Sequence, residues 1–145
     1  MIKSFENVDL MQLIDVFINT YNRPPWYNKW TSETAEQYLC EIIDNKKFAG
    51  FVIWEGRKMV GAALCHFQTW WNSNELYVDE FFIAPQFQWK GYGRTLIESV
   101  STYAVENGLA RVVLITDKRK PAYEFYQKNG FIGLENLVFM CKDVD

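Results

Sequence analysis

The spacing of apolar residues along this chain follows two periods, one typical of helices and one typical of strands. Apolar residues at helical spacing, together with helix start and stop residues, predict helices over residues 9–20, 31–44, 92–107 and 121–130. Short apolar runs bounded by turn residues predict strands over residues 2–5, 48–54, 59–67, 75–83 and 111–116. Residues 131–134 and 137–142 are expected to form two closing strands.

Several element ends carry residues suited to those places. Thr31 or Ser32 is expected to cap the second helix, because a hydroxyl can accept from a free N–H of the first turn. Gly108 fits the position just after the third helix, and Pro121 fits the first turn of the fourth. Gly61 lies inside a strand pattern, which indicates a bulge or a close backbone approach.

The order of elements predicts the fold class. Strand, two helices, a run of antiparallel strands, then helix, strand, helix and strands indicate an α/β or mixed α+β domain. We expect a strongly twisted, mixed, mostly antiparallel sheet flanked by about four helices, with the 111–116 strand parallel to the 75–83 strand. At 145 residues the chain is most simply one domain over residues 1–145.

Composition narrows the function classes. The formal net charge of −3 argues against nucleic acid as a partner and is compatible with a cationic substrate. Cys40, Cys65 and Cys141 show no metal-ligand spacing, so we expect free thiols in a reducing compartment and no metal. The sequence shows neither a signal peptide nor an apolar run long enough for a membrane span, so a cytoplasmic protein is expected.

A strand, a glycine-containing turn and a helix start follow one another between Phe81 and Asn107. Gly91 and Gly93 lack a Cβ, so the backbone there can come close to a ligand. The first N–H groups of the following helix have no intrahelical partner and lie at the positive end of its dipole. With Lys90 and Arg94 beside them, these groups predict a phosphate site.

Two familiar phosphate motifs do not fit this stretch. No Gly-Lys-Ser/Thr is present, and no third glycine follows at the Rossmann spacing. The observed pattern is Gln-x-x-Gly-x-Gly over 88–93 after Phe-Phe-Ile-Ala-Pro, with Ala-x-x-Phe-Tyr-x-x-x-Gly-Phe over 122–131. This combination resembles the GCN5-related N-acetyltransferases, the GNAT superfamily, and the element order over nearly the whole chain agrees with that resemblance.

The resemblance implies a GNAT-type fold, acetyl-CoA as cosubstrate and direct acetyl transfer to a primary amine. It implies that the backbone of Phe81, Phe82 and Ile83 pairs with the pantetheine arm, and that a backbone amide of this strand stabilises the oxyanion. Tyr126 matches the tyrosine that protonates the departing thiolate. Arg119 stands where many relatives have Asn, and it could instead reach a phosphate of the cosubstrate. The pyrophosphate would be held by the turn formed by Gln88, Trp89, Lys90, Gly91, Tyr92, Gly93 and Arg94.

Asp79 and Glu80 interrupt an otherwise apolar strand, where a carboxylate is costly unless it is paired or faces a cleft. In regular alternation they point to opposite faces, so only one could face the substrate. The segment Asp-Glu-Phe-Phe-Ile resembles the Glu-Asp-Phe-Phe-Val of spermidine/spermine acetyltransferases, which implies Asp79 as the base, directly or through water. Glu80 is the competing assignment, and water alone is a third. His66, near a strand end, is expected to be a structural or surface residue.

Aromatic residues crowd the loop that Pro24 and Pro25 break out of the first helix. Trp26, Tyr27 and Trp30 either cover the edge of the core or form a wall of a substrate pocket that faces an ammonium group. Trp70 and Trp71 point to opposite faces if extended, and Trp71 is the second candidate wall.

These features favour a small cationic amine as acceptor, such as a polyamine or an aminoglycoside. A peptide or protein amine, or a non-catalytic acyl-CoA-binding module, remains as an alternative. Relatives often pair through edge strands or C-terminal regions, so a homodimer through residues 137–140 is a further expectation.

Overall fold

The computed structural model describes residues 1–144. Within it the chain forms two compact units, Met1–Ile115 and Thr116–Asp145. The first unit contains the β-sheet and three α-helices, and the second contains one α-helix. That both units act as one domain stays a prediction.

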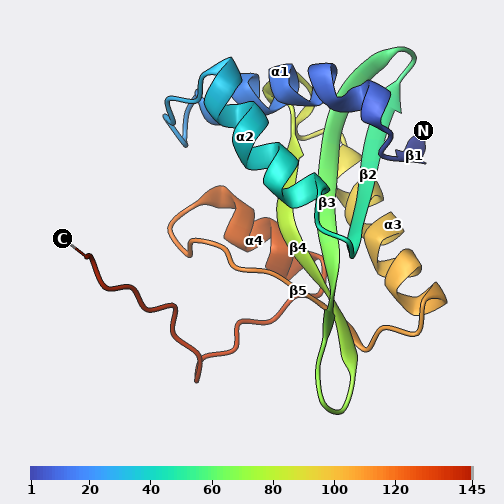
Figure 1. The fold of residues 1–145 in the computed structure, drawn as a ribbon, viewed down its shortest axis with the longest axis vertical. Helices are drawn as coiled ribbons and strands as arrows, with labels where there is room; N and C mark the ends of the chain where they lie inside the picture. Colours follow the sequence, from blue (N-terminus) through green and yellow to red (C-terminus); the bar gives the residue numbers. More distant parts are fainter. Residues whose placement is uncertain (145) are drawn as a thin grey trace. The chain divides into compact units, whose positions relative to one another are not determined.

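The sheet of the first unit has five strands in the order β1-β2-β3-β4-β5 (Figure 1). Three neighbouring pairs are antiparallel, and β4 and β5 are parallel, as the sequence predicts. The sheet is therefore mixed and mostly antiparallel, which confirms the fold class. The strands are β1 (Ile2–Ser4), β2 (Phe48–Glu55), β3 (Lys58–Thr69), β4 (Asn74–Ile83) and β5 (Arg111–Val113).

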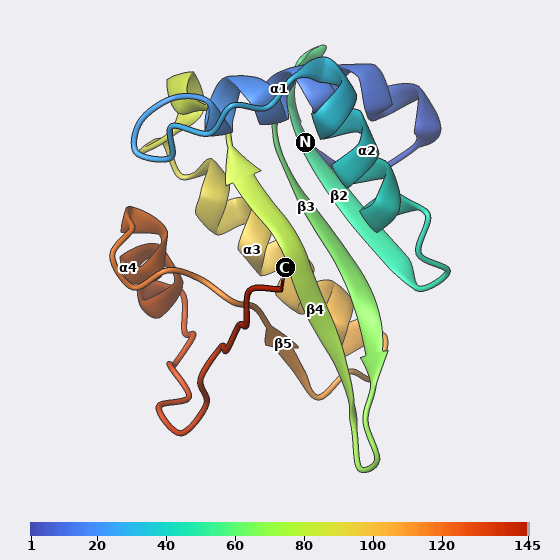
Figure 2. The same cartoon turned by 60° about the vertical axis from the view of Figure 1, so that its left-hand side comes forward.

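Helices cover both faces of this sheet (Figure 2). On one face α1 (Leu10–Tyr21) and α2 (Ser32–Ile43) bury a core against β2, β3 and β4 that includes Leu13, Leu39 and Leu64. On the other face α3 (Tyr92–Glu106) lies against β3 and β4, and its Tyr103 meets the ring of Phe67 edge-on. The remaining helices are η1 (Asn7–Asp9), η2 (Pro85–Phe87) and, in the second unit, α4 (Pro121–Lys128). No helix in residues 1–144 is both long and apolar enough to cross a bilayer.

Local sequence signals explain several element ends. The Thr31 hydroxyl accepts from the Thr34 N–H at 3.1 Å and caps α2, as expected. Gly108 follows α3 with φ +68°, a conformation that glycine adopts without strain. At Gly61, a Cβ would collide with the carbonyl oxygen of Phe82, and the β2–β3 register shifts beside it. Both readings of that glycine, a bulge and a close approach, are confirmed.

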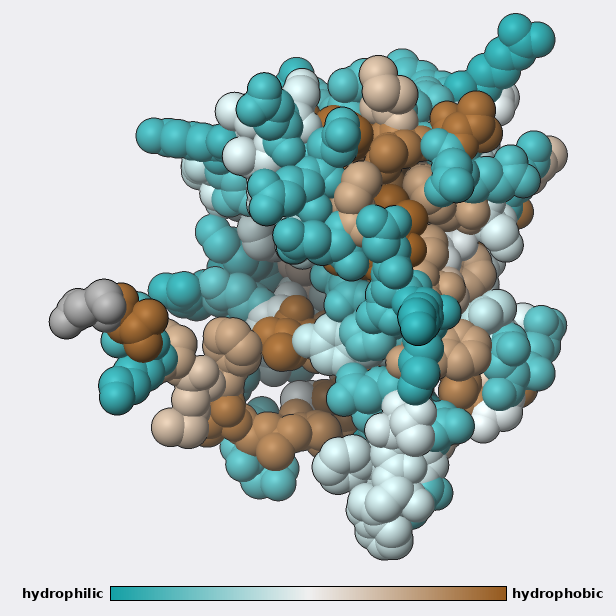
Figure 3. Space-filling view, viewed as in Figure 1, coloured by the Kyte–Doolittle hydropathy of each residue, from teal (hydrophilic) through white to brown (hydrophobic). Residues whose placement is uncertain are grey.

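The two closing strands predicted for the C-terminal stretch are wrong. Residues 131–144 contain no strand, although the segment is rich in apolar residues. A strand needs a partner for its backbone N–H and C=O groups, and no other described segment pairs with this one. Figure 3 shows the apolar side chains along this stretch in brown. Leu137, Val138, Phe139 and Met140 are 65–83% exposed.

Candidate active site

A bulge in β4 sets the positions of the two acidic residues. Leu64 of β3 pairs with Glu80, whereas the next residue, Cys65, pairs with Val78, so Asp79 is an extra residue in β4. An extra residue interrupts the strict alternation of side chains. Asp79 and Glu80 therefore both lie on the face covered by α1 and α2. The expectation that they point to opposite faces is wrong, because it assumed an unbroken strand.

Asp79 is paired with His66 across the strands. The Nδ1 atom of His66 lies 2.6 Å from Oδ2 of Asp79, and the two side chains are 22% and 23% exposed. The imidazole also stacks on the ring of Tyr77, with centroids 5.2 Å apart. His66 and Leu64 share one face of β3, and Leu64 belongs to the core under α1 and α2. Asp79 thus lies on that face as one half of a carboxylate–imidazole pair.

Glu80 lies beneath two tyrosine hydroxyls. Tyr38 of α2 donates to Oε2 of Glu80 at 3.1 Å, and Tyr21 of α1 also hydrogen-bonds this carboxyl group. Burial raises the pKa of Glu80 to about 7, against the lowering effect of the Tyr38 hydrogen bond and together with the nearby charge of Asp79. Burial, followed by the charge of Glu80, likewise raises the pKa of Tyr38. A carboxyl group poised near neutrality can hold a cation or exchange a proton at physiological pH.

The aromatic loop after α1 reaches these tyrosines. Trp30 stacks on Tyr38 with ring centroids 5.2 Å apart, and Trp26 meets Tyr21 edge-on at 5.5 Å. Since both tyrosines bond Glu80, each of these tryptophans lies one ring away from its carboxyl group. These two tryptophans therefore pack beside the tyrosines, as core cover would, and their role as a wall of a substrate pocket stays a prediction. Tyr27 is 69% exposed and turns outward with φ +53°.

Trp71 lies elsewhere in the first unit. It sits in the turn between β3 and β4, the hairpin tip that projects beyond the helices, and is 84% exposed (Figure 1). The last pair of the hairpin is Thr69 with Asn74. Asp79 follows Asn74 by five positions, which corresponds to roughly 16 Å of strand. The structure does not bring Trp71 to the acidic residues.

The end of β4 offers one edge without a strand. On one side Phe81, Phe82 and Ile83 pair with β3. On the other side β5 pairs only with Glu75–Tyr77, and within residues 1–144 no strand pairs with β4 beyond that point. The Tyr21 hydroxyl donates to the Phe81 carbonyl at 3.3 Å. An extended ligand can add to such an edge as a further strand does.

The turn from Gln88 to Gly91 connects this strand end to α3. Gly91 is the N-cap of α3 with φ +89°, and no side chain caps the first N–H groups. Gln88 donates from Nε2 to the Ile83 carbonyl at 2.9 Å, so its side chain ties the turn to the end of β4. Trp89 also has a positive φ of +64° and is 93% exposed. The helix start is thus open and free of a competing side-chain oxygen, as an anion site requires.

Cationic side chains surround this turn. The ammonium groups of Lys90 and of Lys58 lie 5.8 Å and 5.4 Å from the Phe87 ring centroid. Arg94 pairs with Glu98 one turn along α3, at 3.0 Å, where both are exposed. Sequence reasoning missed Lys58, because only the β2–β3 turn brings it to this place. Tyr92 donates its hydroxyl to Glu55 in the same region, and Gly93 lies half-buried in the first turn of α3.

The second unit holds the other two predicted site residues. Tyr126 is buried on α4, and the rings of Phe125 and Phe131 each lie 5.4 Å from its ring. Arg119 is exposed and pairs with Asp117 at 3.0 Å. The side-chain hydrogen bond from Arg119 lowers the pKa of Asp117 to about 2. Any contact of Arg119 with a phosphate would have to compete with this carboxylate.

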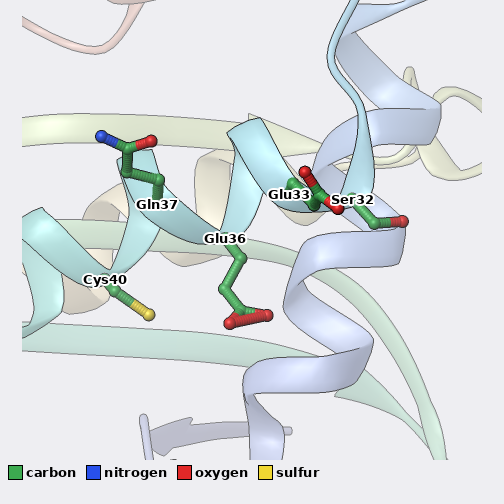
Figure 4. A pocket seen from close by; sticks show the side chains of 5 residues that line it. All are labelled: Ser32, Glu33, Glu36, Gln37 and Cys40. Carbon is green, nitrogen blue, oxygen red and sulfur yellow. The ribbon is translucent and has the colours of Figure 1, made fainter.

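A surface pocket lies along the outer side of α2 (Figure 4). It carries two carboxylates and one thiol, which do not suit a phosphate-bearing ligand. Burial raises the pKa of the Cys40 thiol, and Asp44 and Glu36 add to this. Among the described residues there is no cluster of three or more His, Cys, Asp or Glu side chains able to hold a metal ion. The pocket is lined by Ser32, Glu33, Glu36, Gln37 and Cys40.

Comparison with known proteins gives the family. The chain is 29% identical to a thialysine N-epsilon-acetyltransferase of Caenorhabditis elegans over 103 residues, which covers 70% of this chain and 64% of that protein. It is 32% identical to an uncharacterized N-acetyltransferase of Methanocaldococcus jannaschii over 110 residues, 73% of this chain and 44% of that protein. The chain therefore spans between about two-fifths and two-thirds of the length of these curated relatives.

A solved structure shares the fold. The structure of AAC(6')-Iy in complex with the bisubstrate analogue CoA-S-monomethyl-acetylneamine matches with a TM-score of 0.77 at 17% identity, over 99% of this chain and 98% of that one. The family model "Acetyltransferase (GNAT) family" matches residues 16–131, which include β2 to β5 and the turn before α3. This chain belongs to the GNAT acetyltransferase family.

Proposed function

We propose that this protein transfers an acetyl group from acetyl-CoA to the primary amine of a small cationic acceptor. The observation that carries the proposal is the position of Asp79 and Glu80 on one face of the sheet, next to aromatic rings from α1, α2 and the loop between them. Anionic and aromatic groups together favour an ammonium ion. The family supports the reaction type.

The first unit has the features that acetyl-CoA needs. Acetyl-CoA supplies the activated acetyl thioester. The uncapped start of α3 at Gly91 suits its pyrophosphate, with Lys90 and Lys58 nearby. The edge of β4 beyond Tyr77, where no described strand pairs, suits its extended pantetheine arm. In this proposal Arg94 and Arg119 exchange their present carboxylate partners, Glu98 and Asp117, for phosphate oxygens. The analogue bound to AAC(6')-Iy contains CoA, which supports this choice of cosubstrate.

The acceptor class follows from the groups around the acidic pair. Two of the matched proteins are named with such compounds: thialysine is a cationic amine, and acetylneamine is the acetylated form of one. Trp26 and Trp30 lie one ring away from Glu80 and can present π-faces to an ammonium group. A polyamine or an aminoglycoside-like amine therefore fits the site. Tyr27 and Trp71 are exposed and would contact only the outer part of a longer acceptor.

In the reaction the acceptor nitrogen loses two protons and the departing thiolate gains one. An alkyl ammonium must lose a proton before its nitrogen can attack, and the acidic pair, directly or through water, accepts it. The C–N bond then forms, a backbone amide of β4 stabilises the oxyanion, and the C–S bond breaks. The departing thiolate takes its proton from the hydroxyl of Tyr126, and the second proton that the nitrogen loses on becoming an amide restores this hydroxyl through solvent. Products are the acetylated amine and free CoA.

Two rival functions remain open to test. A peptide or protein amine would need a longer open groove beside the acidic pair. A non-catalytic acyl-CoA-binding module would need the α3 start and the β4 edge alone, without a buried carboxyl group whose pKa is raised to about 7. Glu80 therefore favours catalysis over simple binding.

The deciding experiment is thiol release from acetyl-CoA with a panel of polyamines, aminoglycosides, thialysine and lysine peptides. We expect turnover of at least one small cationic amine and little turnover of the peptides. Turnover of peptides alone would favour the protein-amine reading. Tight acetyl-CoA binding with no thiol release from any acceptor would favour the binding module.

We also propose that the chain self-associates through its C-terminal stretch. Leu137, Val138, Phe139 and Met140 form a run of exposed apolar side chains without a strand partner among the described residues. Such a stretch can add to the sheet of a second copy, as unpaired strands commonly do.

A further inference from the structure

We propose that His66, oriented by Asp79, is the group that removes the proton from the acceptor amine. This inference rests on the proposed function, because it assigns a residue to the acetyl transfer described above. It replaces Asp79 as the direct base and gives His66, expected from the sequence to be structural, a catalytic role.

The geometry of the pair supports this assignment. Nδ1 of His66 lies 2.6 Å from Oδ2 of Asp79. A carboxylate can only accept a hydrogen bond, so Nδ1 carries the proton in the neutral ring, and Nε2 keeps its lone pair. This arrangement is the one that makes an imidazole a general base in hydrolytic triads.

The free nitrogen of His66 is available to a substrate. Within residues 1–144, Nε2 makes no hydrogen bond, and no buried side-chain polar atom is left without a partner, so Nε2 is open to solvent. The ring is held on both sides, by the Asp79 carboxylate and by stacking on Tyr77. A fixed ring with one open nitrogen is what proton abstraction from a bound amine requires.

The two carboxylates are less suited to the same task. Oδ2 of Asp79 is engaged by the imidazole, and Asp79 therefore acts through His66 as a positioning residue. Glu80 accepts a hydrogen bond from Tyr38 and lies beside the Tyr21 hydroxyl, and these two groups hold it in place and cover it. Glu80 on the same face instead serves as the counter-ion of the acceptor, next to the aromatic rings.

The step balances without a further reactant. Nε2 of His66 takes one proton from the acceptor ammonium, and the freed lone pair forms the C–N bond to the acetyl carbon. As the C–S bond breaks, the nitrogen loses its second proton, which balances the proton that the departing thiolate takes up. The imidazolium is stabilised by Asp79 and returns its proton to solvent after product leaves. The titratable groups of the first unit that share this face are Glu75, Tyr77, Asp79 and Glu80 of β4, Tyr38 of α2 and Tyr21 of α1, and Glu75 is paired with Arg111 of β5. On the β2 side His66 pairs with the uncharged Phe48, and Lys47 donates to Thr69 instead.

Imidazole NMR tests the pair without any turnover. His66 is the one histidine of the chain, so its ring signals need no assignment by mutation. At a pH where the ring is neutral, ¹⁵N shifts should show the proton on Nδ1 in the wild type. The Asp79→Asn variant should show a mixture of both tautomers. A wild-type ring with its proton on Nε2 would overturn the proposal, whatever the enzyme assays give.

Steady-state kinetics tests the base. His66→Gln should lower kcat about 100-fold at neutral pH and remove the rising limb of the pH profile, with acetyl-CoA affinity unchanged. The loss of kcat in His66→Gln should be smaller with acceptors whose amine has a low pKa, because these amines are already neutral and need no base. Gln68→Ala, two residues along the same strand face, is the matched control and should keep wild-type rates.

Three results separate the assignments. If Glu80→Gln removes the rise of kcat with pH while His66→Gln keeps this rise, Glu80 is the base and the proposal fails. If His66→Gln lowers kcat by the same factor with all amines, whatever their pKa, His66 is structural and the proposal fails. If the wild type turns over no amine, the proposed function fails first, and the NMR result still decides whether the Asp79–His66 pair has the tautomer that a base needs.

Discussion

Asp79 and Glu80 are neighbours in sequence and lie on the same face of β4. One bonds His66 on β3, and the other accepts from Tyr38 on α2. The bulge at Asp79 produces this arrangement, because it adds one residue opposite Leu64 and Cys65. Two carboxyl groups are thereby held side by side, each with its own partner, and this difference in partners gives each a separate role in the proposed reaction.

Replacing Glu80 by Gln should change how stability depends on pH. The raised pKa of Glu80 means that its protonated form is favoured by folding, so its contribution is fully present below about 4.5 and is lost as pH rises through about 7. A shift of this size corresponds to roughly 3 kcal/mol. Glu80→Gln keeps an acceptor oxygen for Tyr38 but cannot ionise. Urea unfolding at pH 5 and pH 8 should show a smaller loss of stability for the variant than for the wild type. Equal losses would mean that Glu80 titrates normally.

Gly91→Ala should weaken acetyl-CoA binding more than it weakens the fold. Its φ of +89° disfavours any side chain by about 1 kcal/mol, and a Cβ would stand where the backbone meets the pyrophosphate. Gly56→Ala is the matched control, since Gly56 has φ +61° and an added Cβ meets nothing within 4 Å at either position. Calorimetric titration with acetyl-CoA should show at least about a tenfold loss of affinity for Gly91→Ala alone. A similar loss in both variants would point to a general effect of strain.

Tyr126→Phe should slow the release of free CoA by roughly tenfold or more. The hydroxyl acts only as the C–S bond breaks, so kcat should fall while the KM of the acceptor stays close to that of the wild type. Tyr123→Phe, on the same helix, removes a hydroxyl without touching the proposed acid and should keep the wild-type kcat. Thiol release followed with a chromogenic reagent measures both. A wild-type rate for Tyr126→Phe would make Tyr126 a packing residue only.

Phe139→Lys should reduce self-association. Phe139 is 79% exposed, and a charge in the middle of the apolar run would oppose burial against a second copy. Light scattering across a concentration series should show a dimer for the wild type and a shift toward monomer for the variant. Val105→Lys changes an equally exposed apolar residue on α3 and should leave the dimer unchanged. A wild type that is monomeric throughout the series contradicts the proposed interface.

The sequence by itself determined the order, type and approximate limits of most elements, because helix and strand periods, caps and glycines act over short distances. It also marked the turn before α3, where Gly91 needs its left-handed conformation. These features depend on a residue and its near neighbours, and local propensity is enough to predict them.

Only the tertiary structure decided which side chains and strands contact one another. Whether Asp79 meets His66 depends on the β3–β4 register and on a bulge that no single residue announces. Likewise, the apolar runs after Gly130 did not make a strand, since a strand exists only where another backbone satisfies its hydrogen bonds. Contacts between residues distant in sequence, such as Tyr38 with Glu80, follow from how the helices and the sheet pack, and that packing is a property of the whole fold.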